Sequence, residues 1–120
     1  MILDFLSRLV RGPNGLSPKD FVAQREASHP VLDVRTASEF AQEHLKGAIN
    51  IDVSAPDFAR QVERLAKKGK LKADEPVYLY CRSGARSGRA TRLLRHQGYG
   101  QAYNVGGIGG LKRAGAGVGR

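Results

Sequence analysis

The sequence has little of several residue types, and each shortage excludes a class of protein. It contains one cysteine, so no disulfide can form within the chain, and one thiol cannot build a tetrahedral zinc site. It has no tryptophan and only 7% aromatic residues, which does not suggest a base-stacking surface for nucleic acid. No apolar run approaches the roughly 20 residues of a membrane-spanning helix. The opening stretch 1–10 lacks a basic start and a cleavage site, so we expect a cytoplasmic protein.

Positive charge is in excess. The chain has 20 Lys and Arg against 11 Asp and Glu, a net charge of +9. Such an excess attracts anions to the surface. It fits an anionic substrate, an acidic partner protein or nucleic acid, and charge by itself does not choose among them.

The length of 120 residues suits one domain with one core, which we place over residues 1–120. Ile2, Phe5, Leu6 and Leu9 have helical spacing, so residues 1–13 are expected to be an amphipathic N-terminal helix or extension. The glycine-rich residues 115–120 are expected to be a flexible tail.

Short apolar runs alternate with helical patterns, which is typical of a parallel sheet covered by helices. Strands are expected at 30–34, 48–51, 76–80 and 101–105. Helices are expected from Ser17 to about residue 27, from Thr36, from Pro56, and from the residues after Cys81 to Gly98. We therefore predict an α/β fold with a central parallel sheet of about five strands and helices on both faces.

The segment most informative about chemistry lies between a buried strand and a helix. It reads Cys81-Arg82-Ser83-Gly84-Ala85-Arg86-Ser87. Ligands of open parallel sheets bind at this position, outside the carboxyl ends of the strands. Gly84 permits a tight loop whose N–H groups converge on one point, and the helix N-terminus and two arginines add positive charge. A thiolate at Cys81 should therefore have a lowered pKa and be nucleophilic near neutral pH. A cysteine that only fills space requires neither the glycine nor the arginines.

Three segments resemble the rhodanese family, in the family's order and spacing. They are the loop 81–86, the stretch from Leu32-Asp33-Val34-Arg35 through Glu39-Phe40 and His44 to Ile51, and Asn104-Val105-Gly106-Gly107 through Leu111 to Gly115. The chain departs from the family at Leu111, where tryptophan is common, and at Glu43, where glycine is common.

The resemblance implies a sulfurtransferase of the thiosulfate type. Sulfane sulfur would pass from thiosulfate or a similar anionic donor, through a persulfide on Cys81, to a thiol, cyanide or protein acceptor. Loop N–H groups would hold the sulfur, Arg82 and Arg86 would steer the donor, and Arg86 would also brace the loop. No metal or organic cofactor is implied.

Three alternatives remain open. A cysteine phosphatase or arsenate reductase has a similar architecture, but such enzymes place five residues between cysteine and arginine, whereas four separate Cys81 from Arg86. A non-catalytic rhodanese-like module that binds proteins typically lacks the cysteine, which is present here. Nucleic acid binding is not favoured over anion steering, although it is not excluded.

Asp33 and Arg35 end a predicted strand near the expected site. We interpret them first as structural, for instance through an Arg35–Glu39 ion pair, and second as lining the entrance to the site. His44 is expected to be a structural hydrogen-bonding group rather than a base.

Overall fold

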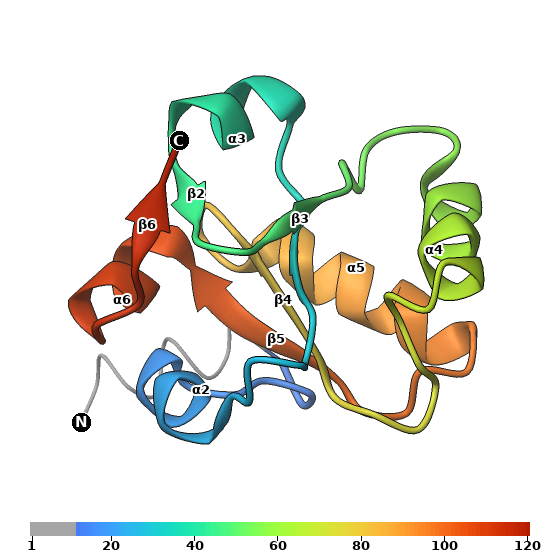
Figure 1. The fold of residues 1–120 in the computed structure, drawn as a ribbon, viewed down its shortest axis with the longest axis horizontal. Coiled ribbons are helices and arrows are strands. Elements are labelled where there is room, and N and C mark those ends of the chain that lie inside the picture. The colour runs from blue at the N-terminus through green and yellow to red at the C-terminus, as the bar shows by residue number, and fades with distance from the viewer. Residues whose placement is uncertain (1–11) are drawn as a thin grey trace.

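The computed structural model describes residues 12–120, so the predicted N-terminal helix within 1–13 lies almost entirely outside the described residues. Four parallel strands form the central sheet in the order β3-β1-β4-β5 (Figure 1). They are β1 (Val31–Asp33), β3 (Ile49–Asn50), β4 (Val77–Cys81) and β5 (Ala102–Gly107). A separate antiparallel ribbon pairs β2 (His44–Leu45) with β6 (Val118–Gly119).

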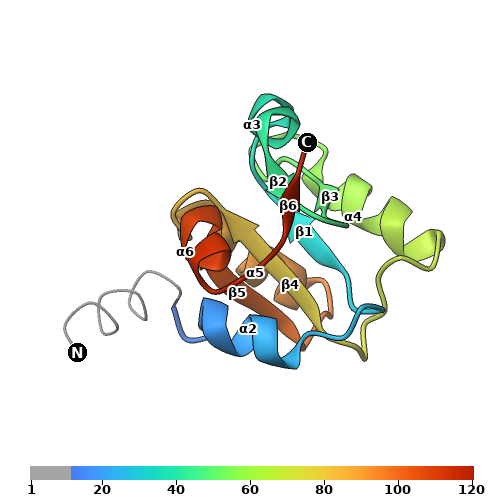
Figure 2. The same ribbon diagram turned by 60° about the vertical axis from the view of Figure 1, so that its left-hand side comes forward.

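Helices cover both faces of the sheet, as the sequence pattern predicts (Figure 2). On one face, α4 (Phe58–Lys67) and α5 (Ala85–His96) contribute Phe58, Val62, Ala90 and Leu94 to the core. On the other face, α2 (Pro18–Gln24) and α6 (Ile108–Arg113) contribute Phe21 and Leu111. The short helix α3 (Ala37–Gln42) follows β1. The α/β class with a parallel sheet and helices on both faces is confirmed.

Two helix starts follow from capping chemistry. Ser17 Oγ accepts a hydrogen bond of 3.0 Å from the backbone N–H of Asp20, and Pro18 occupies the first helical position of α2. Thr36 and Glu39 form the predicted capping box at the start of α3. In α2 the backbone turns extended at Arg25, so this helix ends at Gln24 rather than near residue 27.

The main sheet has four strands rather than about five, and the tail is structured. Residues 44–45 form β2 outside this sheet, where the backbone N–H of Leu45 donates to the Tyr80 hydroxyl at 3.0 Å and β2 pairs with β6. Residues 115–120 were expected to be flexible, but they contain β6. The N–H of Lys46 donates to the carbonyl of Gly117 at 3.0 Å, and Val118 packs against the core.

The side chains of β4 alternate between the two faces of the sheet, and this alternation sets the face on which Cys81 lies. All five residues of β4 are buried, and side chains alternate between the two faces of a strand. Val77, Leu79 and Cys81 join the core under α4 and α5, whereas Tyr78 and Tyr80 join the core under α2 and α6. Cys81 is therefore the last residue of β4. It lies on the face covered by α4 and α5, just before the loop that leads into α5.

Candidate active site

The cysteine lies at the junction of β4 and α5, as the sequence predicts. Gly84 is the N-cap of α5 and has φ of 98°, a left-handed conformation that glycine adopts without strain. This turn brings the backbone N–H of Gly84 to 2.9 Å from Cys81 Sγ. The residue Cys81 is fully buried, while Arg82, Ser83 and Ala85 around it are exposed.

The sulfur is surrounded by hydrogen-bond donors. Burial raises the pKa of the Cys81 thiol, but hydrogen bonds from the Ser87 hydroxyl and from the N–H groups of Ser87, Ser83 and Gly84 outweigh it. The net pKa of the thiol lies below its ordinary value. The N-terminus of the twelve-residue helix α5 favours negative charge at the same place. The arrangement stabilises a thiolate, which is the nucleophilic form of cysteine.

Ser87 connects the sulfur to a neighbouring strand. Its Oγ lies 3.3 Å from Cys81 Sγ and 2.7 Å from Asn104 Oδ1, and all three residues are buried. Asn104 Nδ2 also donates to the carbonyl of Gly84 at 2.9 Å. Asn104 therefore fixes the loop from β5. We did not assign it to the site from the sequence, although a polar residue within an otherwise apolar strand is a signal that could have identified it.

Arg86 is bound by a carboxylate. Its two terminal nitrogens donate to Glu39 at 2.7 and 3.0 Å. The hydrogen bond from Arg86 lowers the pKa of Glu39 to about 2, against the opposing effect of burial and with help from Thr36. The pair links Arg86 in the first turn of α5 to Glu39 of α3, and it neutralises the charge of Arg86. Arg82 is exposed and forms no ion pair with the residues of 12–120, so it is the better candidate for steering anions.

The loop also packs closely against the end of β5. A Cβ built on Gly107 would collide with the carbonyl oxygen of Arg82 and lie 3.2 Å from Ser83 Cα. Only glycine permits this approach, because real Cβ atoms do not come so near to backbone atoms. Gly107 thus supports the active-site loop by packing.

Asp33 and Arg35 form a buried structural pair. Arg35 Nη2 lies 2.6 Å from Asp33 Oδ2, and the Tyr80 hydroxyl donates to the same oxygen at 2.7 Å. The predicted Arg35–Glu39 pair is wrong, because Glu39 binds Arg86 and Arg35 binds Asp33 and the carbonyl of Glu43. Asp33 and Arg35 are therefore held by protein contacts, which fits the structural interpretation.

The remaining sequence candidates add no further chemistry. His44 Nδ1 lies 2.8 Å from the carbonyl of Phe40, in agreement with a structural role. Within residues 12–120, no cluster of three or more His, Cys, Asp or Glu side chains is suited to hold a metal ion. No helix in the same part of the chain is long and apolar enough to cross a membrane.

Comparison with known proteins places the site in context. The family described as "Rhodanese-like domain" matches residues 17–114. Thiosulfate sulfurtransferase PspE of Escherichia coli is 38% identical over 77 residues, covering 64% of this chain and 68% of PspE. The human single-domain sulfurtransferase TSTD1 superimposes with a TM-score of 0.62 at 30% identity, covering 80% of this chain and 91% of TSTD1.

Two other relatives are longer than the region that matches. The uncharacterized protein YqhL of Bacillus subtilis is 40% identical over 85 residues, which are 71% of this chain and 60% of YqhL. The mitochondrial protein HIGH ARSENIC CONTENT 1 of Arabidopsis thaliana is 39% identical over 88 residues, which are 66% of this chain and 49% of that protein.

Proposed function

Because the chain belongs to the rhodanese-like domain family, we propose that it is a sulfurtransferase that carries sulfane sulfur as a persulfide on Cys81. The observation that carries this proposal is the sulfur of Cys81 held by the Gly84 N–H at 2.9 Å and by Ser87 at 3.3 Å. Donors directed at Sγ stabilise the thiolate that attacks the sulfur donor and that is released again when the acceptor takes the sulfur.

The first step uses an anionic donor such as thiosulfate. The Cys81 thiolate attacks the outer sulfur of the donor, a new S–S bond forms to Sγ, and the S–S bond of thiosulfate breaks. Sulfite leaves with the electron pair, so no proton has to be supplied to it. Cys81 is fully buried, and the neighbouring loop residues Arg82 and Ser83 are exposed, so the donor approaches Sγ from the side of this loop.

The second step returns the enzyme to its starting state. A thiolate acceptor or cyanide attacks the outer sulfur of the persulfide, and Cys81 leaves as a thiolate that its hydrogen bonds stabilise. The two half-reactions share one covalent intermediate and predict ping-pong kinetics. No residue has to act as a general base when Cys81 is already ionised.

The oxyanion alternative has one specific observation against it and one relative in its favour. A loop arginine that binds a tetrahedral oxyanion directs its charge at the ligand, but Arg86 is paired with the Glu39 carboxylate, which repels an incoming oxyanion. The relative named HIGH ARSENIC CONTENT 1 makes arsenate the oxyanion to test.

The decisive experiment is intact mass measurement after incubation with thiosulfate. We expect the wild-type protein to gain the mass of one sulfur atom, and to lose it again with cyanide as thiocyanate forms. Cys81→Ser should gain none. Parallel reactions with arsenate plus a thiol reductant and with an aryl phosphate test the alternative. Absence of the sulfur adduct together with turnover of either oxyanion would replace the sulfurtransferase proposal.

A further inference from the structure

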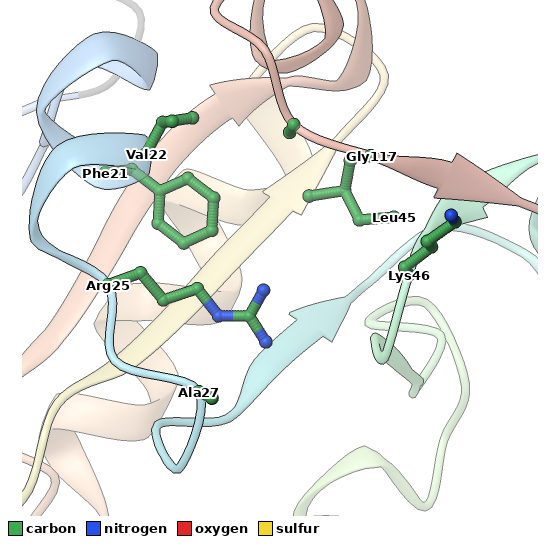
Figure 3. A pocket seen from close by; sticks show the side chains of 8 residues that line it. Phe21, Val22, Arg25, Ala27, Leu45, Lys46 and Gly117 are labelled. Carbon is green, nitrogen blue, oxygen red and sulfur yellow. The ribbon is translucent and has the colours of Figure 1, made fainter.

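A pocket lies away from the active-site loop. It has a volume of about 400 Å³ and is enclosed by α2, by the turn that follows β2, and by the segment that precedes β6 (Figure 3). Its lining includes Phe21, Arg25, Leu45, Lys46 and Ala116. None of the lining residues belongs to the loop 81–87, and Phe21 and Leu45 pack on the face of the sheet opposite to Cys81.

One wall of this pocket carries a cation without a counter-charge. Arg25 extends from the end of α2 into the space between Phe21, Ala27 and Leu45 (Figure 3). Its Nε is buried and has no hydrogen-bond partner, and no ion pair in residues 12–120 involves this side chain. A buried donor without a partner costs free energy, and a charged one costs more. Burial accordingly lowers the pKa of Arg25, against a smaller opposing effect of Tyr78.

The opposite wall adds a second cation. Lys46 follows β2 directly, is exposed, and forms no ion pair with the described part of the chain. The Lys46 stem lies beside Gly117, and its amine points away from Arg25 (Figure 3), so Arg25 is the cation that faces into the pocket and Lys46 adds positive charge at its rim. The four ion pairs of residues 12–120 all lie elsewhere, including the pair of Lys112 with Glu43 on the exposed surface.

The rest of the lining is apolar. Phe21 and Leu45 are each 2% exposed and form the floor, and Val22 is a partly exposed aliphatic side chain at the rim. The guanidinium carbon of Arg25 lies 5.9 Å from the centre of the Phe21 ring. An apolar floor with a few convergent polar groups is typical of small-molecule sites, and this volume lies at the lower end of their range.

We propose that this pocket binds a small organic anion, in which a carboxylate or sulfonate is attached to an aromatic or aliphatic body. The acidic group pairs with Arg25 and accepts its unused hydrogen bond, while the body rests against Phe21 and Leu45 and Lys46 adds positive charge at the rim. An inorganic anion makes no use of the floor, and a neutral molecule of the same shape leaves the guanidinium unpaired. Binding therefore requires both parts of the ligand.

The test is a titration of the full chain with 2-naphthoate, followed by amide proton–nitrogen NMR. We expect saturable shifts at residues 21–27, 45–47 and 116–118, and about tenfold weaker binding of the neutral 2-naphthamide, a difference of about 1.4 kcal/mol. Acetate should produce no saturable shift at these residues. Equal binding of naphthoate and naphthamide would overturn the proposal, as would the absence of shifts in the three segments.

Variants locate the site independently of the spectra. Arg25→Gln should weaken naphthoate binding by about fivefold to tenfold, whereas Lys46→Gln should weaken it by no more than about twofold, because this amine is exposed at the rim. Arg89→Gln is the matched control, because it removes a cation from another apolar pocket, next to Leu93 and Phe58. If Arg89→Gln weakens binding and Arg25→Gln does not, the ligand occupies that other pocket and the proposal is wrong. Sulfur loading of Cys81 should be unchanged in Arg25→Gln, so this test stands apart from the proposed function.

Discussion

At the scale of single residues, the reactivity of the site depends on one proton of Ser87. Its hydroxyl can donate one hydrogen bond, but three acceptors lie within reach. They are Asn104 Oδ1 at 2.7 Å, the carbonyl of Gly84 at 3.2 Å and Cys81 Sγ at 3.3 Å. A full negative charge on sulfur attracts this proton more strongly than a neutral thiol does. The Cys81 thiolate and Asn104 Oδ1 therefore compete for the same hydroxyl proton of Ser87.

Replacing Ser87 by alanine tests this role. We expect Ser87→Ala to raise the pKa of Cys81, because the hydroxyl is the strongest of the hydrogen-bond donors that lower it. The rate of Cys81 alkylation by iodoacetamide, measured against pH, should shift to higher pH and fall several-fold at pH 7. The lost hydrogen bonds should also destabilise the fold by about 1 kcal/mol.

Ser28→Ala is the control, since this serine is exposed and lies outside the loop. It should leave both the alkylation profile and the unfolding midpoint unchanged. A Ser87→Ala profile that coincides with the wild-type profile would mean that backbone N–H groups alone set the pKa of Cys81.

At the scale of elements, one side chain joins two helices. Glu39 caps the start of α3 through Thr36 and binds Arg86 in the first turn of α5. The ion pair thus ties α3, which follows β1, to the loop that follows β4. Glutamine can keep the capping box, because its side-chain oxygen also accepts from the N-cap residue, but it cannot keep the charge. Glu39→Gln therefore isolates the ion pair.

We expect Glu39→Gln to lower the free energy of unfolding by about 1 kcal/mol at pH 7, a value near the top of the range for a partly exposed pair. Because folding lowers the pKa of Glu39 from 4.5 to about 2, its stabilising effect is complete above about pH 4.5 and disappears as the pH falls towards 2. Urea unfolding of both proteins at several pH values should show the curves converging in acid.

The pair of Glu43 with Lys112 provides the comparison. Its side chains are 38% and 44% exposed, so Glu43→Gln should change the stability by no more than a few tenths of a kcal/mol at pH 7. If Glu39→Gln and Glu43→Gln lower the free energy of unfolding equally, then the Glu39–Arg86 pair stabilises the fold no more than an ordinary surface pair does.

Local contacts within an element were predictable from the sequence, whereas contacts between elements were not. The Thr36–Glu39 capping box spans three residues, and its pattern can be read directly. The Glu39–Arg86 pair spans 47 residues and depends on how α3 and α5 meet. Proximity in the sequence favoured Arg35 as the partner of Glu39, but Arg35 turns back to the buried Asp33 because burial there requires a paired charge.

At the scale of the whole molecule, the layers and the four strands of the main sheet were predictable, whereas the small β2–β6 ribbon was not. Apolar runs such as 76–80 mark the strands of a buried parallel sheet, and the loop after Cys81 falls at their carboxyl end as expected. Residues 44–45 and 118–119 are too short and too rich in glycine and polar groups to be recognised as strands. They become a ribbon only because the fold brings the C-terminus alongside β2.

The net charge of +9 is also a property of the whole molecule, and its effect can be separated from the local chemistry. With Arg86 neutralised by Glu39, attraction of a donor rests on exposed cations such as Arg82 and on the overall field. The rate of sulfur loading from thiosulfate, a dianion, should fall several-fold between about 10 mM and about 500 mM NaCl, because the screening length shrinks from about 30 Å to a few ångströms. Alkylation of Cys81 by neutral iodoacetamide, measured at the same salt concentrations, should hardly change.

Arg82→Gln should lower the rate of sulfur loading at low salt and flatten its salt dependence, while leaving the rate of alkylation unchanged. If alkylation and loading respond equally to salt, the salt acts on the thiolate itself, and long-range steering plays no part in the reaction.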